Sequence, residues 1–345
     1  MLPWIFSMRH PDGRLHTRHA MSRAACVGVC AIGVLGCGKK VDEPSSTGQS
    51  GSVAQSSSAS PASSANALPK TSLAAVWGSG ASDIWAVGAK GAITHYDGHA
   101  WSANESPTTK NLSAISGSGR TDVWAVGDEG TTLHFDGSSW KVTGENKSQT
   151  LLGLWVGSKT DAWASGIDED VSVIRHYDGK KWDDADVGGA TSLWEAWGSS
   201  STDVWMVGTD HKGQGFMLQG NGKHFERAPF EGGSLRSVWG TGPNQIFVAA
   251  YEGQIWSYDG KTKKWTESPT SPKDKLLGLW GSSSTDVWAV GLAGAAYHFD
   301  GQTWTKQPTG TTEAFWAAWG STASDVWLVG TGGTIRHWDG HAFGH

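Results

Sequence analysis

The sequence predicts an all-β chain whose folded part is a seven-bladed β-propeller of four-stranded antiparallel blades, preceded by a disordered N-terminal tether. The unit 276–304 holds three short apolar runs, LLGLW, DVWAV and AAYHF, separated by Gly-rich turns, and Trp304 begins a fourth run. Runs of about five aromatic and branched residues suit strands and are too short for helices. The unit recurs at intervals of 39 to 42 residues, the size of a propeller blade. The blades start at Leu73, Leu112, Leu151, Leu193, Leu235, Leu276 and Phe315.

Composition agrees with a fold of aromatic strands and tight turns. The 345 residues include 22 Trp and 48 Gly, and only 17% of them are charged. The net charge of -6 shows no excess of positive charge that would bind nucleic-acid phosphates, so we expect no nucleic-acid partner. Cys26, Cys30 and Cys37 all precede the repeats. The repeats therefore contain no disulfide, no thiolate metal site and no cysteine nucleophile.

The first two strands of each unit have distinct predicted roles. The first strand should line the central axis, where converging strands need small residues. Its third position reads Ala75, Ala114, Gly153, Glu195, Ser237, Gly278 and Ala317, and Glu195 is the exception. The second strand carries one aromatic side chain per unit, which predicts packing between sheets rather than ligand binding. These aromatic residues are Trp85, Trp124, Trp163, Trp205, Phe247, Trp288 and Trp327.

The third strand ends in a repeated His-aromatic-Asp-Gly turn, from which the fourth repeat departs at residues 218–222. Asp accepts local backbone N–H groups and Gly adopts φ > 0, so this pair suits a hairpin. The predicted structural turn residues are Asp97, Asp136, Asp178, Asp259, Asp300 and Asp339. Because blades radiate from an axis, the repeated histidines lie too far apart to share a metal ion. We expect them to be structural.

Residues 1–36 are interpreted as an export signal whose true start is Met21. Arg23 precedes an apolar run, Ala24–Leu35, that is too short to span a membrane. The run ends in VLGC, which resembles a bacterial lipobox and implies cleavage before Cys37 and lipidation of its sulfur. Acyl chains such as palmitate would then hold the chain at a membrane. An ordinary secretory signal or a short buried segment is the alternative.

Residues 37–69 are predicted to be the lipidated cysteine and a flexible linker, and residues 70–345 the propeller. The linker is rich in Ser, Ala, Gly and Pro and lacks large apolar side chains. Gly38 is not the Asp that retains some lipoproteins in the inner membrane, so we expect the outer membrane of a bacterial cell envelope. Residues 64–69, SANALP, are similar to SANESP of the first outer strand. This similarity predicts that they complete the last blade.

The repeats resemble those of bacterial Trp-rich lipoproteins with the pattern WG…DVWAVG…HYDG. The turn resembles a shortened Asp-box, as in the BNR repeats of sialidase-like and photosystem-assembly propellers. The fifth unit also resembles a tectonin repeat, a family that includes lectins. The resemblance covers residues 73–343 and implies a fold more than a function.

The variable loops form the candidate binding surface. The turns between strands one and two and between three and four are nearly constant, and both sets lie on one face. The opposite face carries the varied turns between strands two and three and the blade connections. There the third and fourth blades offer Asp168, Glu169, Asp170, Asp183, Asp184, Asp210 and His211. This cluster would suit Ca²⁺ or a basic partner, and a solvated acidic edge is the alternative. Trp194 and Trp316 are candidates for stacking on a sugar, and Glu195 lies nearby.

We expect a binding or scaffold protein, anchored at the surface and monomeric, with no obligate cofactor and an unidentified protein or glycan ligand. Five arginines of the repeats are scattered among different blades, and no serine-hydrolase, zinc-protease or phosphate-binding motif occurs. The first alternative is a tectonin-like lectin. The second is a sialidase-like, glycan-cleaving enzyme built around Glu195 and the acidic loops.

Overall fold

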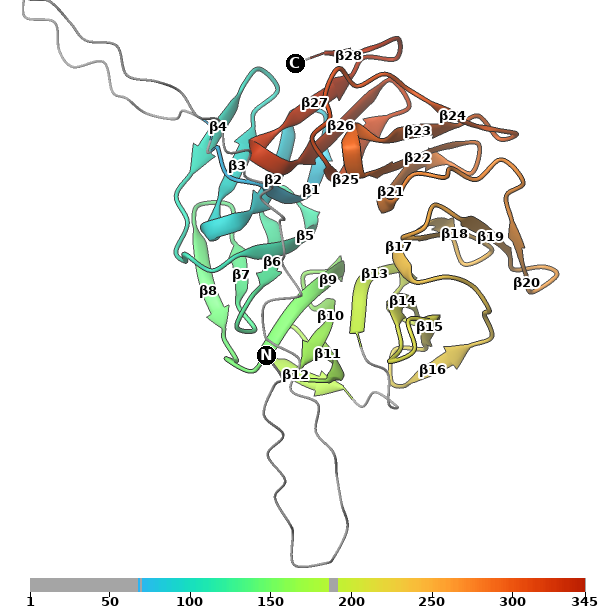
Figure 1. Cartoon of the computed structure of the whole chain (residues 1–345). Helices are drawn as coiled ribbons and strands as arrows, with labels where there is room; N and C mark the ends of the chain where they lie inside the picture. Colours follow the sequence, from blue (N-terminus) through green and yellow to red (C-terminus); the bar gives the residue numbers. More distant parts are fainter. Residues whose placement is uncertain (1–67, 69, 186–191, 345) are drawn as a thin grey trace, which may run out of the picture. The chain divides into compact units, whose positions relative to one another are not determined.

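The computed structural model describes residue 68, residues 70–185 and residues 192–344. In these residues the strands form seven sheets, each with four antiparallel strands in chain order (Figure 1). Each sheet is one blade, and the predicted repeat starts fall at the first residue of the first strand or within two residues of it. The predicted seven-bladed propeller is therefore confirmed.

The first three blades occupy residues 73–185. Blade one consists of β1 (Leu73–Gly80), β2 (Asp83–Gly88), β3 (Ile93–Tyr96) and β4 (Trp101–Asn104). Blade two consists of β5 (Leu112–Gly119), β6 (Asp122–Gly127), β7 (Thr132–Phe135) and β8 (Trp140–Gly144). Blade three consists of β9 (Gln149–Ser158), β10 (Asp161–Asp168), β11 (Val171–Tyr177) and β12 (Trp182–Ala185).

The last four blades follow the same order. Blade four has β13 (Ser192–Ser200), β14 (Asp203–Thr209), β15 (Gly215–Gly220) and β16 (Phe225–Ala228). Blade five has β17 (Leu235–Gly242), β18 (Gln245–Ala250), β19 (Ile255–Asp259) and β20 (Lys264–Glu267). Blade six has β21 (Leu276–Ser283), β22 (Asp286–Gly291), β23 (Ala296–Phe299) and β24 (Trp304–Lys306). Blade seven has β25 (Phe315–Thr322), β26 (Asp325–Gly330), β27 (Ile335–Trp338) and β28 (Phe343–Gly344).

The inner strands close the ring. Each first strand contacts the first strand of the next blade, and β25 of blade seven contacts β1 of blade one. The backbone N–H of Gly332 also donates to the Ser72 hydroxyl across this junction. Of the segment predicted to complete blade seven, residues 64–67 and 69 lie outside the described residues, as do the export signal and most of the linker. Within the described chain β28 is the outer strand of blade seven.

The hydrophobic core lies between neighbouring blades, where the recurring aromatic of the second strand packs. Trp288 is fully buried, and its ring lies 5.1 Å from Trp338 and 5.4 Å from Phe343 of blade seven. Trp85 packs in the same way against Phe135 and Trp140 of blade two. These contacts confirm that the repeated aromatic is a core residue.

A hydrogen-bond network fixes the constant turns of most blades. In blade one the buried Asp83 carboxylate lies 2.7 Å from His95 Nε2 and accepts from the Ser79 hydroxyl. The His95 ring also stacks on Trp85 at 4.1 Å. Four other blades repeat the Asp–His pair, at 2.6 to 2.8 Å. In blade four the Gln219 amide donates to Asp203 instead. The histidines are thus structural, as predicted.

The predicted Asp-Gly turns form beside this network. Asp97 accepts from the backbone N–H groups of Ala100 and His99, which lower the pKa of its carboxyl. Asp136, Asp178, Asp259, Asp300 and Asp339 each accept from a backbone N–H two residues ahead. In five of these turns the glycine has φ between 90° and 96°. A Cβ on Gly98 would lie 2.8 Å from Ser82, so both constant turn sets share one face, here called the turn face.

A chain of tryptophan–glycine contacts joins the inner strands, and it is interrupted once. A Cβ on Gly117 would lie 2.7 Å from the Trp77 ring of the preceding blade, and blades one, four, five, six and seven have the same relation. Between blades two and three, Ser116 replaces the tryptophan and the buried Val156 replaces the glycine. The backbone N–H of Val156 donates to the Ser116 hydroxyl at 3.3 Å. The two replacements compensate each other in volume.

This exchange predicts a non-additive pair of substitutions. Ser116→Trp alone is expected to cost about 1–3 kcal/mol of unfolding free energy, because the new indole meets Val156. Val156→Gly alone leaves a void and also destabilises the chain. The double variant restores the Trp–Gly contact of the other junctions and should be more stable than the sum of the single effects predicts. Denaturant unfolding of the four chains measures the coupling, and strict additivity would contradict it.

Candidate functional site

A β-bulge occurs at the start of the first strand of every blade. In blade one Leu73 pairs with Gly88 and Ala75 pairs with Val87, so Ala74 is left without a paired position. The other six blades skip the corresponding residue. A bulge re-aims a side chain away from the regular ladder. Because the first strand begins where the second ends, the bulges lie opposite the turn face, on what we call the variable face.

The seven bulged residues differ in chemistry although the scaffold around them repeats. They are Ala74, Ser113, Leu152, Trp194, Arg236, Leu277 and Trp316, and we call them the rim. None is fully buried, and Trp316 is the most open of the large apolar members, at 37% exposure. The first two blades contribute small side chains, and the remaining five contribute large ones. The propeller therefore presents an asymmetric surface on the variable face.

Aromatic rings and cations stack along the rim at blades four and five. The Arg236 guanidinium lies 3.8 Å from the centre of the Trp194 ring and 5.1 Å from that of Tyr251. Lys275 Nζ lies 4.3 Å from the Tyr251 ring and 3.0 Å from the Glu252 carboxylate. Such contacts fix long side chains in place, each with about 0.5–1 kcal/mol at exposed sites. The Trp194 indole N–H donates to the Thr209 hydroxyl, which holds that ring as well.

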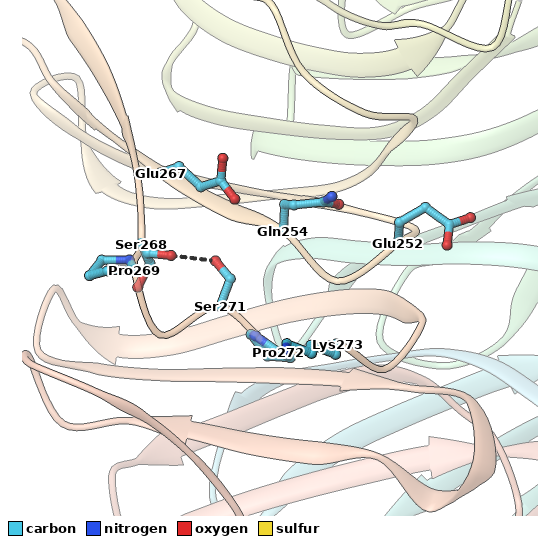
Figure 2. A pocket seen from close by; sticks show the side chains of 8 residues that line it. All are labelled: Glu252, Gln254, Glu267, Ser268, Pro269, Ser271, Pro272 and Lys273. Carbon is cyan, nitrogen blue, oxygen red and sulfur yellow. Dashed lines mark hydrogen bonds between the residues drawn. The ribbon is translucent and has the colours of Figure 1, made fainter.

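Two open hollows lie in blades five and six, and Glu252 of the stack lines the first of them. The first, of about 390 Å³, lies between the turn at Glu252 and Gln254 and the connection that runs from Glu267 to Lys273 (Figure 2). The Ser271 hydroxyl braces that connection by donating to the Ser268 carbonyl and accepting from the Ile255 N–H. The second, of about 840 Å³, is formed by residues 293–294 and 306–312 of blade six. Both are shallow hollows on the variable face, which suits contact with an extended partner better than enclosure of a small molecule.

Several of the predicted acidic residues of blades three and four are engaged by partners within their own blade. The Asp184 carboxylate pairs with Arg175 at 3.3 Å, and that of Asp183 with Lys181 at 2.9 Å. Asp210 accepts from the Gln214 and Lys212 N–H groups, which lower its pKa and close its turn. His211 is exposed in the same turn. Asp168, Glu169 and Asp170 form the turn between β10 and β11, and Glu169 has φ +53°.

The acidic loops were also candidates for binding Ca²⁺. Within the described part of the chain no three or more His, Cys, Asp or Glu side chains are placed to share a metal ion. The connection of residues 186–191, which follows Asp183 and Asp184, lies outside the described residues. Calcium binding at these loops stays a prediction.

The described residues include no helix that is long and apolar enough to cross a membrane.

Glu195 occupies a structural position between two inner strands. One carboxylate oxygen accepts from the backbone N–H of Val238 in blade five at 2.8 Å. Burial raises the pKa of the carboxyl to about 7, against the lowering effect of bonds from Ser237 and Val238. The Ser237 hydroxyl accepts in turn from the Leu279 N–H of blade six at 2.8 Å. Glu195 and Ser237 thus link the inner strands of three blades.

Arg236, Tyr251, Glu252 and Lys275 were not predicted from the sequence as site residues. For Arg236 a signal was present, because the second position of the first strand changes chemical class from repeat to repeat while its neighbours stay similar. The bulge that re-aims the side chain at this position depends on strand register, and the alignment of the repeats does not show register. Of the two predicted surface tryptophans, Trp316 is exposed, whereas Trp194 is half-buried and covered by Arg236.

The fold and the rim define the chain as a repeat β-propeller with one differentiated face. No protein-family model matches it, and no curated protein is similar to it in sequence. Solved structures of the same fold are similar. YCF48 bound to D1 peptide has a TM-score of 0.63 and 18% identity, over 79% of this chain and 94% of the other.

Two further solved structures give comparable likenesses. The WD40 β-propeller domain of Doa1 has a TM-score of 0.65 and 10% identity, covering 80% of this chain and 95% of the other. YCF48 from Cyanidioschyzon merolae has a TM-score of 0.62 and 14% identity, covering 79% and 98%. Likeness at these identities shows the fold.

Proposed function

We propose that this chain is a lipid-anchored protein of the bacterial envelope whose propeller is a non-catalytic binding module with the rim as its contact surface. The observation that carries the proposal is the set of seven bulges, which place chemically different side chains on an otherwise repeated scaffold. Trp, Tyr and Arg, the residue types enriched at binding hot spots, are concentrated at blades four, five and seven.

A binding role is also supported by the solved structure of YCF48, a similar propeller described with a bound peptide. Catalysis at Glu195 is less well supported, because a carboxylate oxygen of Glu195 is engaged by Val238 in a link between strands. For the lectin alternative, Trp316 remains a candidate for stacking on a sugar ring. Trp194 is a weaker candidate, since Arg236 lies over its ring.

Site-specific photo-crosslinking tests the rim. A photoreactive phenylalanine analogue at Leu277, on the rim, should cross-link a partner when the full chain is expressed in its native bacterial host. The same analogue at His99, on the turn face, is the control. The proposal requires that Trp316→Ala abolish the cross-link from position 277. Equal cross-linking from both faces would overturn the rim as the contact surface.

The lipid anchor is proposed from the sequence VLGC at residues 34–37 and the linker that follows. Cys37→Ala is expected to move the chain from the membrane fraction to the soluble fraction and to abolish incorporation of labelled palmitate. Cys30→Ala is the matched control and should leave both unchanged. Retention of Cys37→Ala in the membrane fraction, with palmitate still incorporated, would exclude this anchor. Separation of inner from outer membranes of the wild-type strain tests the proposed outer-membrane location.

A further inference from the structure

Resting on the proposed lipid anchor, we infer that the turn face of blades three to five docks on anionic lipid headgroups of the membrane, which directs the rim away from the bilayer. The docking surface is a group of exposed lysines, here called the lysine patch. The patch consists of Lys159, Lys180, Lys223, Lys261, Lys263 and Lys264.

The hairpin between the third and fourth strands changes the sign of its charge in these three blades. In blade three, residues 178–181 carry two Lys against one Asp, and in blade five, residues 259–264 carry three Lys against one Asp. In blade four Asn221 replaces the Asp and Lys223 follows it. The hairpins of the other four blades each carry one Asp and no Lys or Arg, and they are residues 97–100, 136–139, 300–303 and 339–342.

The three positive hairpins lie next to one another on the turn face. The Trp163 ring of blade three lies 5.1 Å from that of Phe225, the first residue of β16 in blade four. The Trp205 ring of blade four lies 6.0 Å from that of Trp265, in β20 of blade five. The outer hairpins of blades four and five are therefore each packed against the preceding blade, which places their lysines on one continuous surface.

The charges of the patch are not neutralised by ion pairs within the described residues. Lys181 pairs with Asp183 at 2.9 Å and is left out of the patch for that reason. Lys159 lies beside the hairpin of blade three, because a Cβ on Gly179 would lie 2.7 Å from Thr160. A patch of several such lysines attracts anionic lipids and is a second signal that stabilises a lipid anchor at a bilayer.

The variable face would be repelled by the same membrane surface. Its turns between the second and third strands carry seven Asp or Glu and only two Lys. Glu129 and Glu252 pair with Lys110 and Lys275 of the blade connections, and counting these two lysines still leaves an excess of carboxylates. An anionic bilayer therefore attracts one face of the propeller and repels the other. The seven acidic residues are Asp128, Glu129, Asp168, Glu169, Asp170, Asp210 and Glu252.

The shape of the patch favours a flat bilayer over a polysaccharide chain. Both hollows described above lie on the variable face, whereas the patch consists of exposed lysines on hairpin turns. Lysine is a compact charge on a flexible stem, and it needs no fixed geometry to attract a charged surface. A polysaccharide would need polar groups arranged around its individual sugar rings.

The chain between the anchor and β1 is long enough for this orientation. β1 begins on the variable face, so the tether joins the propeller on the side away from the docked bilayer. Residues 37–69 span up to roughly 110 Å when extended. The eight-residue β1, which runs from the variable face to the turn face, is only about 26 Å long. The tether can therefore pass around the edge of the propeller.

Energy transfer to labelled lipids tests the orientation. The repeats contain no cysteine, so one donor dye can be placed at Ser201→Cys on the turn face or at His211→Cys on the variable face of the same blade. The full lipidated chain is reconstituted in vesicles with acceptor-labelled headgroups, made of phosphatidylcholine alone or mixed equally with phosphatidylglycerol. In the anionic vesicles, transfer from position 201 should exceed that from position 211 at least about twofold, and salt should reduce the difference. In phosphatidylcholine the two should be alike.

Charge variants assign the effect to the patch. Lys180→Gln, Lys223→Gln and Lys261→Gln combined should lower transfer from position 201 to its level in phosphatidylcholine vesicles. The matched control removes the same charge from exposed lysines of the variable face and should not lower this transfer. It combines Lys90→Gln, Lys147→Gln and Lys212→Gln.

Equal transfer from the two positions in anionic vesicles would overturn the inference, and so would a patch variant with unchanged transfer. Binding of oligogalacturonate at the patch without any effect of phosphatidylglycerol would assign the lysines to a polysaccharide and would also overturn it. A chain that carries no palmitate and shows no transfer from either position would instead remove the proposed anchor itself.

Discussion

Trp288→Ala is expected to lower the unfolding free energy by about 3–5 kcal/mol, the largest single effect that we predict. Trp288 is fully buried at the junction of blades six and seven, where it contacts Trp338 and Phe343 and adjoins His298. Truncation leaves a cavity that these rings cannot fill without shifting the sheets. Urea unfolding followed by Trp fluorescence and by circular dichroism measures the loss.

Trp316→Ala is the matched control for this prediction. It removes the same side chain from the same protein, but from a position that is 37% exposed on the rim. Its cost should be clearly smaller than that of Trp288→Ala, because the side chain is partly exposed and its removal leaves no enclosed cavity. Equal destabilisation by the two variants would mean that the second-strand tryptophan is not the core residue that its burial indicates.

The fold could be predicted because its determinants are local and repeated. Apolar runs separated by Gly-rich turns specify short strands, and the Asp-Gly turns specify hairpins, so seven copies define seven blades. The recurring aromatic at Trp288 and its equivalents was interpreted correctly, since a residue required once per blade serves the blade. The relation of Ser116 to Val156 was not foreseen. These residues are 40 positions apart, and only the arrangement of adjacent inner strands shows that one compensates for the other.

The site was predicted less completely, for a different physical reason. The variable face was recognised from loop variation, and Trp194, Glu195 and Trp316 were named. The structure places Glu195 between inner strands and covers Trp194 with Arg236. Arg236, Tyr251 and Lys275 come together from β17, the turn after β18 and the connection before β21. Sequence periodicity predicts on which face of a strand a side chain lies. A contact between a cation and an aromatic ring depends instead on how loops of different lengths come together in space.

Glu195 leads to a prediction for pH. Its carboxyl has a pKa of about 7 in the folded chain, raised from 4.5 by burial. Between these two values the folded state holds a proton that the unfolded state has released. Stability therefore falls as pH rises from about 4.5 to 7, and the contribution above pH 7 is a penalty of about 3 kcal/mol. Below about pH 4.5 both states are protonated and the penalty is absent.

Glu195→Gln should remove this penalty, because the neutral amide oxygen can still accept from the Val238 N–H. We expect the variant to be more stable than the wild type by up to about 3 kcal/mol at pH 8 and similar to it at pH 4. The turn aspartates have pKa values below their usual range and so titrate at lower pH, and they are common to both chains and cancel in the difference. Glu252→Gln, in an exposed turn, is the control and should show no such dependence. Urea midpoints across this pH range give the result, and a difference that does not grow with pH would show that Glu195 ionises without cost between the strands.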